Sequence, residues 1–247
     1  NPNLTKPGYD TTYRIIANDN ALGAALAAYT ADTLKLKNVA VIDDRTAYGQ
    51  GLASVYKKVA AEKGIKIVEE QFTTDKSTDF MSILTAIKAK NPDAVFFGGM
   101  DAQAGPMLRR MAQLGLSKQK YFGGDGFCTS ELAKLTAGAP TLTNVVCAVG
   151  GASLEKMPGG KDWKARYDAK FPGQFQVYSP YTYDATMLLV DAMQRAGSWD
   201  PKKYIPELKK SNYQGVTAKI AFESNGEMKN PAVTLFAYKD GQKVPLN

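Results

Sequence analysis

Short apolar segments alternate with amphipathic segments between residues 38 and 149, and this alternation restricts the possible folds more than any other feature. Each amphipathic segment carries apolar residues at the i, i+3, i+4, i+7 spacing of a helix packed on a sheet. Strands that are apolar throughout and separated by helices are typical of a parallel sheet covered on both faces. We therefore predict an α/β fold with parallel sheets between helical layers. The predicted strands are Val39–Ile42, Ile65–Val68, Ala94–Phe97, Tyr121–Phe122 and Asn144–Val149.

The last third of the chain does not follow this alternation. Its helices carry apolar residues on several sides and need a sheet to pack on, yet no strand is predicted between them. Two antiparallel strands are predicted after the helices, at 218–222 and 232–238, around a turn at 224–226. The predicted helices are 163–171, 183–196 and 201–210.

The first residues are unusual in the same way. A loop leads directly into a predicted helix at 19–36, and no strand is predicted before it. The unpaired helices at the other end of the sequence need strands that the chain does not supply. We therefore expect one lobe of the fold to be incomplete, with its missing strands upstream of Asn1.

The composition is that of an ordinary globular protein and excludes several functions. At 247 residues, the chain is long enough for two lobes, and no apolar run is long enough to span a bilayer. The net charge of +7 is spread along the chain, whereas a nucleic-acid binder gathers basic residues on one stripe. No histidine is present, which excludes a histidine-based triad. Phosphate-loop and dinucleotide-binding motifs are also missing, so we expect neither an enzyme nor a cofactor.

The two cysteines, Cys128 and Cys147, leave two alternatives open. A pair of cysteines cannot form a structural zinc site, which needs four ligands. Their spacing is compatible with a disulfide in an oxidising compartment and equally with two buried thiols.

Glycine-rich loops follow two neighbouring predicted strands. One loop is Gly98-Gly99-Met100-Asp101, and the other is Gly124-Asp125-Gly126. In an open α/β sheet, ligands bind beyond the carboxyl ends of the strands. A closely approaching backbone, an apolar side chain and a carboxylate would meet there, which suits a small molecule with an ammonium group and an apolar body.

The same residues also have structural interpretations. Asp125 could cap a helix beginning near Thr129 or serve as a turn residue, and Asp101 could be the N-cap of its own helix. Met100 could be an ordinary core residue. The charged cluster at 43–45 could be an acid pair, but a loop that caps the following helix is the simpler interpretation.

Five segments of the chain together are similar to one protein family. They are IDDRTAYGQG (Ile42–Gly51), FFGGMDAQAG (Phe96–Gly105), FGGDGFCTSEL (Phe122–Leu132), PYTYDA (Pro180–Ala185) and FESNGEMKN (Phe222–Asn230). In order and spacing they resemble the periplasmic leucine/isoleucine/valine-binding proteins, the substrate-binding components of branched-chain amino acid ABC importers. The resemblance covers essentially the whole chain.

The resemblance implies a two-lobed type I periplasmic binding protein that closes over its ligand. Residues 13–149 and 222–247 would form the second lobe, and 1–12 and 152–220 the remnant of the first. It further implies a small amino-acid ligand, a membrane ABC permease as partner, no nucleic acid, and a periplasmic location with a signal peptide upstream. The uncovered first-lobe helices could associate with a second copy or an upstream fragment.

The resemblance also implies binding roles for individual residues. Asp125 would hold the α-ammonium group, and Tyr48 would line the cleft. Met100 and Asp101 would contact the ligand side chain, and Tyr178 or Tyr181 would close the pocket wall. The residues that bind the α-carboxylate would lie upstream of Asn1. The alternatives are a ligand-sensing domain of a regulator or receptor with this fold, or a binder of another small ligand such as an aromatic acid or amide.

Overall fold

The computed structural model describes residues 1–246 and divides into two compact units. Unit 1 contains Asn1, residues 18–150 and the segment from Val233 onward, whereas unit 2 contains 2–17 and 151–232. Both units are therefore built from segments that are distant in the sequence.

Unit 1 is a seven-stranded sheet with the strand order β2-β1-β3-β4-β5-β8-β9. The first five strands of this order are parallel, β8 runs antiparallel to β5, and β9 runs antiparallel to β8. The predicted parallel α/β sheet is therefore present. The strands are β1 (Asn38–Asp43), β2 (Lys66–Phe72), β3 (Ala94–Gly98), β4 (Lys120–Gly123), β5 (Val145–Gly150), β8 (Val233–Lys239) and β9 (Gln242–Pro245).

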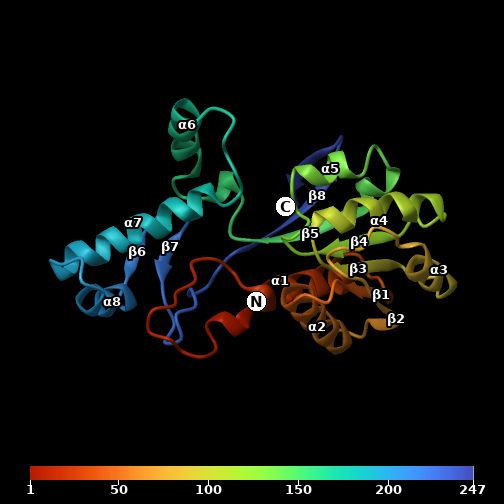
Figure 1. Cartoon of the computed structure of the whole chain (residues 1–247), viewed down its shortest axis with the longest axis horizontal. Coiled ribbons are helices and arrows are strands. Elements are labelled where there is room, and N and C mark those ends of the chain that lie inside the picture. Colours follow the sequence, from red (N-terminus) through yellow and green to blue (C-terminus); the bar gives the residue numbers. More distant parts are fainter. Residues whose placement is uncertain (247) are drawn as a thin grey trace. The chain divides into compact units, whose positions relative to one another are not determined.

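Helices cover both faces of this sheet (Figure 1). Successive strand residues point to opposite faces, so Phe96 packs with α1 and α2, whereas Phe97 packs with α3, α4 and α5. A ring stack of 4.0 Å joins Tyr56 to Phe96 within the first of these layers. The helices are α1 (Asp19–Ala28, continued by a π-helical turn at Tyr29–Thr33), α2 (Ala47–Glu62), α3 (Met81–Ala89), α4 (Asp101–Gln113), α5 (Glu131–Leu135) and a 3-10 helix at Pro140–Asn144.

Unit 2 is mainly helical and has a small two-stranded sheet. Its core joins the helices to this sheet through Leu188, Leu208, Ile220 and Phe222. Asp184 is fully buried and accepts hydrogen bonds from the backbone N–H groups of Val216 at 2.9 Å and Thr217 at 2.7 Å. The elements are α6 (Gly160–Lys170), α7 (Ser179–Ala196), α8 (Pro201–Lys209), β6 (Asn212–Gln214), β7 (Lys219–Ala221) and 3-10 helices at Pro2–Leu4 and Leu154–Lys156.

The prediction that strands 218–222 and 232–238 pair with each other is wrong. β7 pairs with β6, a strand that the sequence analysis missed, and β8 pairs with β5. The chain leaves unit 2 between Ala232 and Val233, so the two predicted strands lie in different units. Around the predicted turn, a bridge between Phe222 and Met228 and backbone hydrogen bonds from Glu223 to Glu227 and from Lys229 to Ala221 are present.

The boundaries of the two units also differ from those of the predicted lobes, in which 13–149 and 222–247 form one lobe. Residues 13–17 and 222–232 belong to unit 2, where Arg14 forms an ion pair with Glu227 at 3.1 Å and the Tyr13 ring lies 4.8 Å from Phe222. The identification of these units with a second lobe and a remnant of a first lobe stays a prediction.

Two further observations bear on the sequence analysis. Cys128 and Cys147 form a disulfide, so the buried-thiol alternative does not hold. Among residues 1–246, no helix is both long enough and apolar enough to cross a membrane.

Candidate functional site

The candidate site lies at the edge of the unit 1 sheet where β1, β3 and β4 end. Because these strands are parallel, the loops that follow them meet at one edge. The loops lead into α2, into α4 and toward α5. Tyr48 lies in the first turn of α2, Met100 and Asp101 lie at the start of α4, and Asp125 lies in the loop after β4. The structure therefore brings together the four predicted site residues of unit 1.

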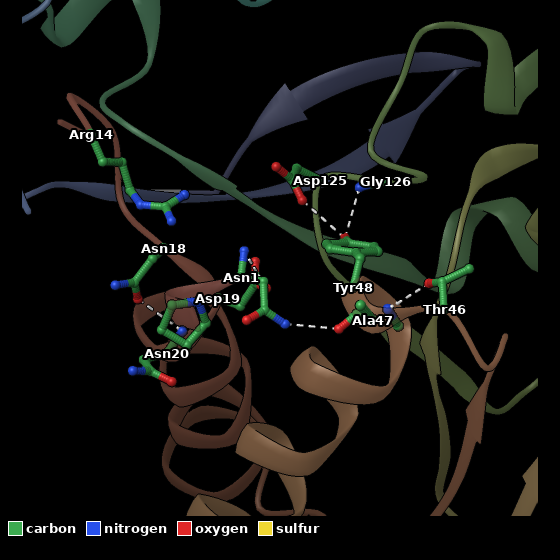
Figure 2. Close-up of polar contacts among 12 residues, drawn as sticks. Asn1, Arg14, Asn18, Asp19, Asn20, Thr46, Ala47, Tyr48, Asp125 and Gly126 are labelled. Atoms are coloured by element: carbon green, nitrogen blue, oxygen red, sulfur yellow. Dashed lines mark hydrogen bonds and ion pairs between the residues drawn. The ribbon is translucent and has the colours of Figure 1, made fainter. Parts of the chain in front are cut away.

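The Tyr48 hydroxyl connects the first turn of α2 to the Asp125 loop. It donates a hydrogen bond to Oδ1 of Asp125 at 2.9 Å and accepts one from the backbone N–H of Gly126 at 2.9 Å, as Figure 2 shows. Burial, with the negative charge of Asp125, raises the pKa of Tyr48 well above its ordinary value. Tyr48 therefore stays a protonated donor and fixes the orientation of the carboxylate.

The glycines around Asp125 allow this loop to approach its neighbours. A Cβ atom on Gly126 would lie 2.6 Å from the carbonyl oxygen of Gly99 and 2.8 Å from the Tyr48 ring. A Cβ atom on Gly124 would lie 2.6 Å from the Tyr48 hydroxyl. These short distances explain why a glycine stands on each side of Asp125.

Met100 and Asp101 occupy the start of α4. Met100 is the N-cap residue, so the interpretation of Asp101 as N-cap is wrong. The Met100 side chain is 42% exposed and is therefore not a core residue. Asp101 accepts a hydrogen bond from Thr129 Oγ1 at 2.7 Å, and its N–H donates to the carbonyl of Gly126 at 3.1 Å. These two contacts connect the β3 loop to the β4 loop.

The structure also decides the alternatives for Asp125. The helix α5 has Ser130 as its N-cap residue, so the Asp125 side chain does not cap it. The Asp125 carbonyl does accept a hydrogen bond from the Cys128 N–H at 3.2 Å, as a turn residue would. Its carboxylate is held by Tyr48, a contact that the sequence did not predict.

The loop after β1 caps α2, as the simpler interpretation predicted, with Thr46 as the cap and Asp44 of the charged cluster supporting it. Asp44 is buried and accepts hydrogen bonds from the N–H and the hydroxyl of Thr46, at 2.9 and 2.6 Å. Thr46 in turn accepts from the Gly49 N–H at 3.0 Å and is the N-cap residue. The sequence analysis missed Thr46, although a threonine just before a helix is an N-cap signal.

The two remaining candidates lie in unit 2. Tyr181 is 7% exposed, and burial with the charge of Asp184 raises its pKa to about 12. Tyr178 is exposed and lines a cavity of 760 Å³ with Trp163 and Tyr183. Their part in closing a pocket wall stays a prediction.

The residues of the site offer carboxylate, hydroxyl and backbone groups and no metal-binding constellation. Within the described chain, no cluster of three or more histidine, cysteine, aspartate or glutamate side chains could hold a metal ion.

A model of the periplasmic binding protein family matches residues 2–243. The chain belongs to this family. The match covers both units and all the loops of the candidate site. The family consists of binding proteins rather than enzymes.

Individual relatives agree with this assignment. The chain is 33% identical to an amino acid binding protein of Pseudomonas aeruginosa over 98% of its own length and 64% of the relative's. It is 30% identical to Leu/Ile/Val-binding protein homolog 1 of Brucella abortus, over 100% of its own length and 66% of the relative's. The chain therefore spans about two thirds of the length of these two relatives.

A solved structure gives the same result for the fold. The leucine binding protein LivK of Thermotoga maritima is 26% identical, with a TM-score of 0.91 over 100% of this chain and 70% of that chain. The predicted fold class, a type I periplasmic binding protein fold, is thereby confirmed. The resemblance to leucine/isoleucine/valine-binding proteins is confirmed as well.

Proposed function

We propose that this protein binds a small neutral L-amino acid, in first place a branched-chain one, and delivers it to a membrane ABC permease. The observation that carries the proposal is the Asp125 carboxylate, which Tyr48 orients at the carboxyl edge of the unit 1 sheet. Asp125 would bind the α-ammonium group of the ligand.

The chemistry of this site favours a cation with a hydrogen-bonding N–H. An ammonium group taken out of water needs an acceptor, and a charge-assisted hydrogen bond is about twice as strong as a neutral one. A carboxylate offers about four lone-pair positions and can accept hydrogen bonds from several donors at once. Asp125 can therefore hold a ligand while Tyr48 keeps it in place.

The apolar part of the ligand would lie against Met100. This side chain is exposed beside Gly126, and the flexible thioether of methionine adapts to apolar groups of different shape. Asp101 would border the same loop, and Tyr178 or Tyr181 would complete the wall. A branched aliphatic side chain fits such a surface better than a charged one does.

The relatives support the class of ligand. One relative is an amino acid binding protein, another is a Leu/Ile/Val-binding protein homolog, and LivK is a leucine binding protein. By the hinge closure that the family resemblance implies, the ligand would shift an open–closed equilibrium through its different affinity for the two states. The closed form would then be recognised by the permease.

A periplasmic location is part of the same proposal. The disulfide between Cys128 and Cys147 supports it, because structural disulfides persist in oxidising compartments such as the periplasm.

Equilibrium binding of L-leucine, L-isoleucine, L-valine and L-phenylalanine, with D-leucine for comparison, tests the proposal. The matched variants are Asp125→Asn, which keeps an oxygen for Tyr48 but loses the charge, and Asp162→Asn at an exposed carboxylate of α6. Loss of a charge-assisted hydrogen bond, about 1.5–3 kcal/mol, predicts binding about 10- to 150-fold weaker for Asp125→Asn. Asp162→Asn is expected to bind like the parent.

Two results would contradict the proposal. Equal affinity for L-leucine and D-leucine would show that the site does not distinguish the configuration at the α-carbon. An Asp125→Asn variant that binds as tightly as the parent would show that the carboxylate does not hold the ligand. Binding of an aromatic acid or amide in preference to every amino acid would favour the alternative ligand class.

A further inference from the structure

Two side chains from the hairpin formed by β8 and β9 hold the end of the loop that carries Asp125. The Tyr238 hydroxyl donates a hydrogen bond to the carbonyl of Thr129 at 2.6 Å. The Lys243 ammonium donates one to the carbonyl of Cys128 at 2.9 Å. Both carbonyls lie three or four residues beyond Asp125, in the segment that connects β4 to α5.

Lys243 is placed in a costly position for a charged group. Burial lowers the pKa of its ammonium, which means that the charged form has lost part of its hydration. The ammonium lies 4.7 Å from the centre of the Phe236 ring, where a cation–π contact offsets part of that loss. The Lys243 ammonium therefore contacts two uncharged groups, a backbone carbonyl and an aromatic ring.

Together with the disulfide, these contacts form a ring that begins and ends at Cys128. Cys128 is bonded to Cys147 on β5, and Cys147 lies opposite Phe236 in the antiparallel pairing of β5 and β8. Phe236 contacts Lys243, and Lys243 returns to the carbonyl of Cys128. The backbone of Cys128 is thus fixed from the sheet through one covalent and one hydrogen-bonded connection.

The rest of the loop is held from the other side. Phe127 is fully buried, with its ring centre 5.4 Å from that of Tyr121. Gly126 is bonded through its N–H to Tyr48 and through its carbonyl to the N–H of Asp101. Asp125 therefore precedes four consecutive residues, 126–129, that are each fixed to neighbouring elements of unit 1.

We propose that Lys243 and Tyr238 are positioning residues for Asp125, and that the β8–β9 hairpin is a clamp that preorganises the ligand-binding loop. The proposal rests on the proposed function of Asp125 as the ammonium-binding group. Preorganisation removes the entropy that a mobile loop loses when the ligand binds. Without the clamp, the loop has to be ordered by the ligand, and affinity falls.

Hydrogen exchange of the loop amides in the ligand-free protein tests the clamp directly. Lys243→Met keeps the stem but loses the ammonium, Lys243→Arg restores a charged donor, and Tyr238→Phe removes one hydroxyl. Lys239→Met, at an exposed lysine on the same hairpin, is the matched control. We expect faster exchange at the amides of Gly126 and Cys128 in Lys243→Met and Tyr238→Phe, parental exchange in Lys239→Met, and substantial recovery in Lys243→Arg.

The affinity for L-leucine is measured on the same variants. In Lys243→Met, ligand binding would have to order one or two additional side chains of the loop. This cost predicts binding about three- to tenfold weaker, with recovery in Lys243→Arg. Parental loop exchange in both Lys243→Met and Tyr238→Phe would overturn the clamp. Faster exchange with unchanged leucine affinity would overturn the positioning role. Absence of binding of all four L-amino acids by the parent would overturn the proposed function, and the exchange data would still decide whether the clamp exists.

Discussion

The hydroxyl of Tyr181 occupies the position where a side chain on residue 151 would begin. A Cβ atom built on Gly151 would lie 1.7 Å from the Tyr181 hydroxyl oxygen. Gly151 also has a φ of +98°, in a region that L side chains rarely adopt. Gly151 is the first residue of unit 2 after β5. The clash with the Tyr181 hydroxyl and the positive φ each require glycine at this position.

Gly151→Ala is therefore expected to destabilise unit 2. The positive φ costs about 1–2 kcal/mol, and displacement of the Tyr181 ring adds about 1–3 kcal/mol. Gly173→Ala is the control, because Gly173 has a φ of +72° and no atom near its Cβ position. Both tryptophans of the chain, Trp163 and Trp199, lie in unit 2, so urea unfolding followed by tryptophan fluorescence reports on this unit. Equal losses for the two variants would contradict the steric argument.

Asp184→Asn is expected to weaken unit 2 as well. The buried carboxylate accepts from two backbone N–H groups and from the Thr217 hydroxyl at 2.5 Å. An asparagine presents one acceptor oxygen and turns an amide donor toward these donors, so we expect a loss of about 2–3 kcal/mol. Thr217→Val, which removes the hydroxyl alone, should cost about 1 kcal/mol. Fluorescence-detected unfolding gives both values, and a smaller loss for Asp184→Asn than for Thr217→Val would contradict this account.

Removal of the disulfide is expected to destabilise unit 1 in particular. The cysteines are separated by 19 residues, and closure of a loop of this size restricts the unfolded chain by about 3 kcal/mol. Cys128→Ala with Cys147→Ala should lower the urea midpoint observed by circular dichroism more than the midpoint observed by tryptophan fluorescence. The two proteins should become similar when the parent is reduced with dithiothreitol. A persistent difference in reductant would mean that packing of the sulfur atoms, and not the cross-link, causes the loss.

The buried tyrosines are expected to ionise only as the protein unfolds. Burial is the main cause that raises the pKa of seven tyrosines, and the effect is largest for Tyr48, Tyr56, Tyr121, Tyr181 and Tyr238. Below about pH 10, both the folded and the unfolded chain keep these groups protonated. Above it, only the unfolded chain ionises, so the free energy of unfolding falls as the pH rises toward the folded-state pKa values. The lowered pKa of Lys243 acts in the opposite sense, because deprotonation relieves the cost of its burial.

Absorbance at about 295 nm, together with circular dichroism, checks the titration. We expect the buried tyrosines to ionise together with unfolding. Tyr121→Phe should reduce the absorbance change that accompanies unfolding, since Tyr121 is fully buried. Ionisation of all tyrosines in one step, with the circular dichroism of the native state retained, would contradict the predicted burial effect.

The parallel part of unit 1 could be predicted because its signals are local. β1, β3, β4 and β5 each contain a short apolar run, whereas β2 continues past Val68 into polar residues. Each helix between the strands has its own apolar stripe, and Phe96 and Phe97 pack on opposite faces of the sheet. The pairing of β8 with β5 could not be predicted in this way. It joins Val146 to Ala237, which are separated in the sequence by residues 151–232 of unit 2. Nothing in the local sequence distinguishes this partner from a neighbouring hairpin strand.

The candidate site was predictable in part for the same reason. The glycine-flanked position of Asp125 indicates a loop at a strand end, and the family motifs indicate Tyr48. The hydrogen bond between these two residues spans 77 positions and follows only from the folded sheet. Lys243 and Tyr238 carry no motif, so their contacts with the Asp125 loop could be found only in three dimensions.

The discontinuous build of unit 1 has a consequence for the way the chain folds. Because a chain is synthesised from its N-terminus, β5 is made well before β8, and residues 151–232 are synthesised in between. At about 5–20 residues per second, synthesis of this interval of roughly 80 residues takes on the order of 4–16 s. Throughout that time the apolar edge of β5 has no partner on one side, and an open edge can pair with another chain. The unit whose strands are made first is therefore the last to complete its sheet.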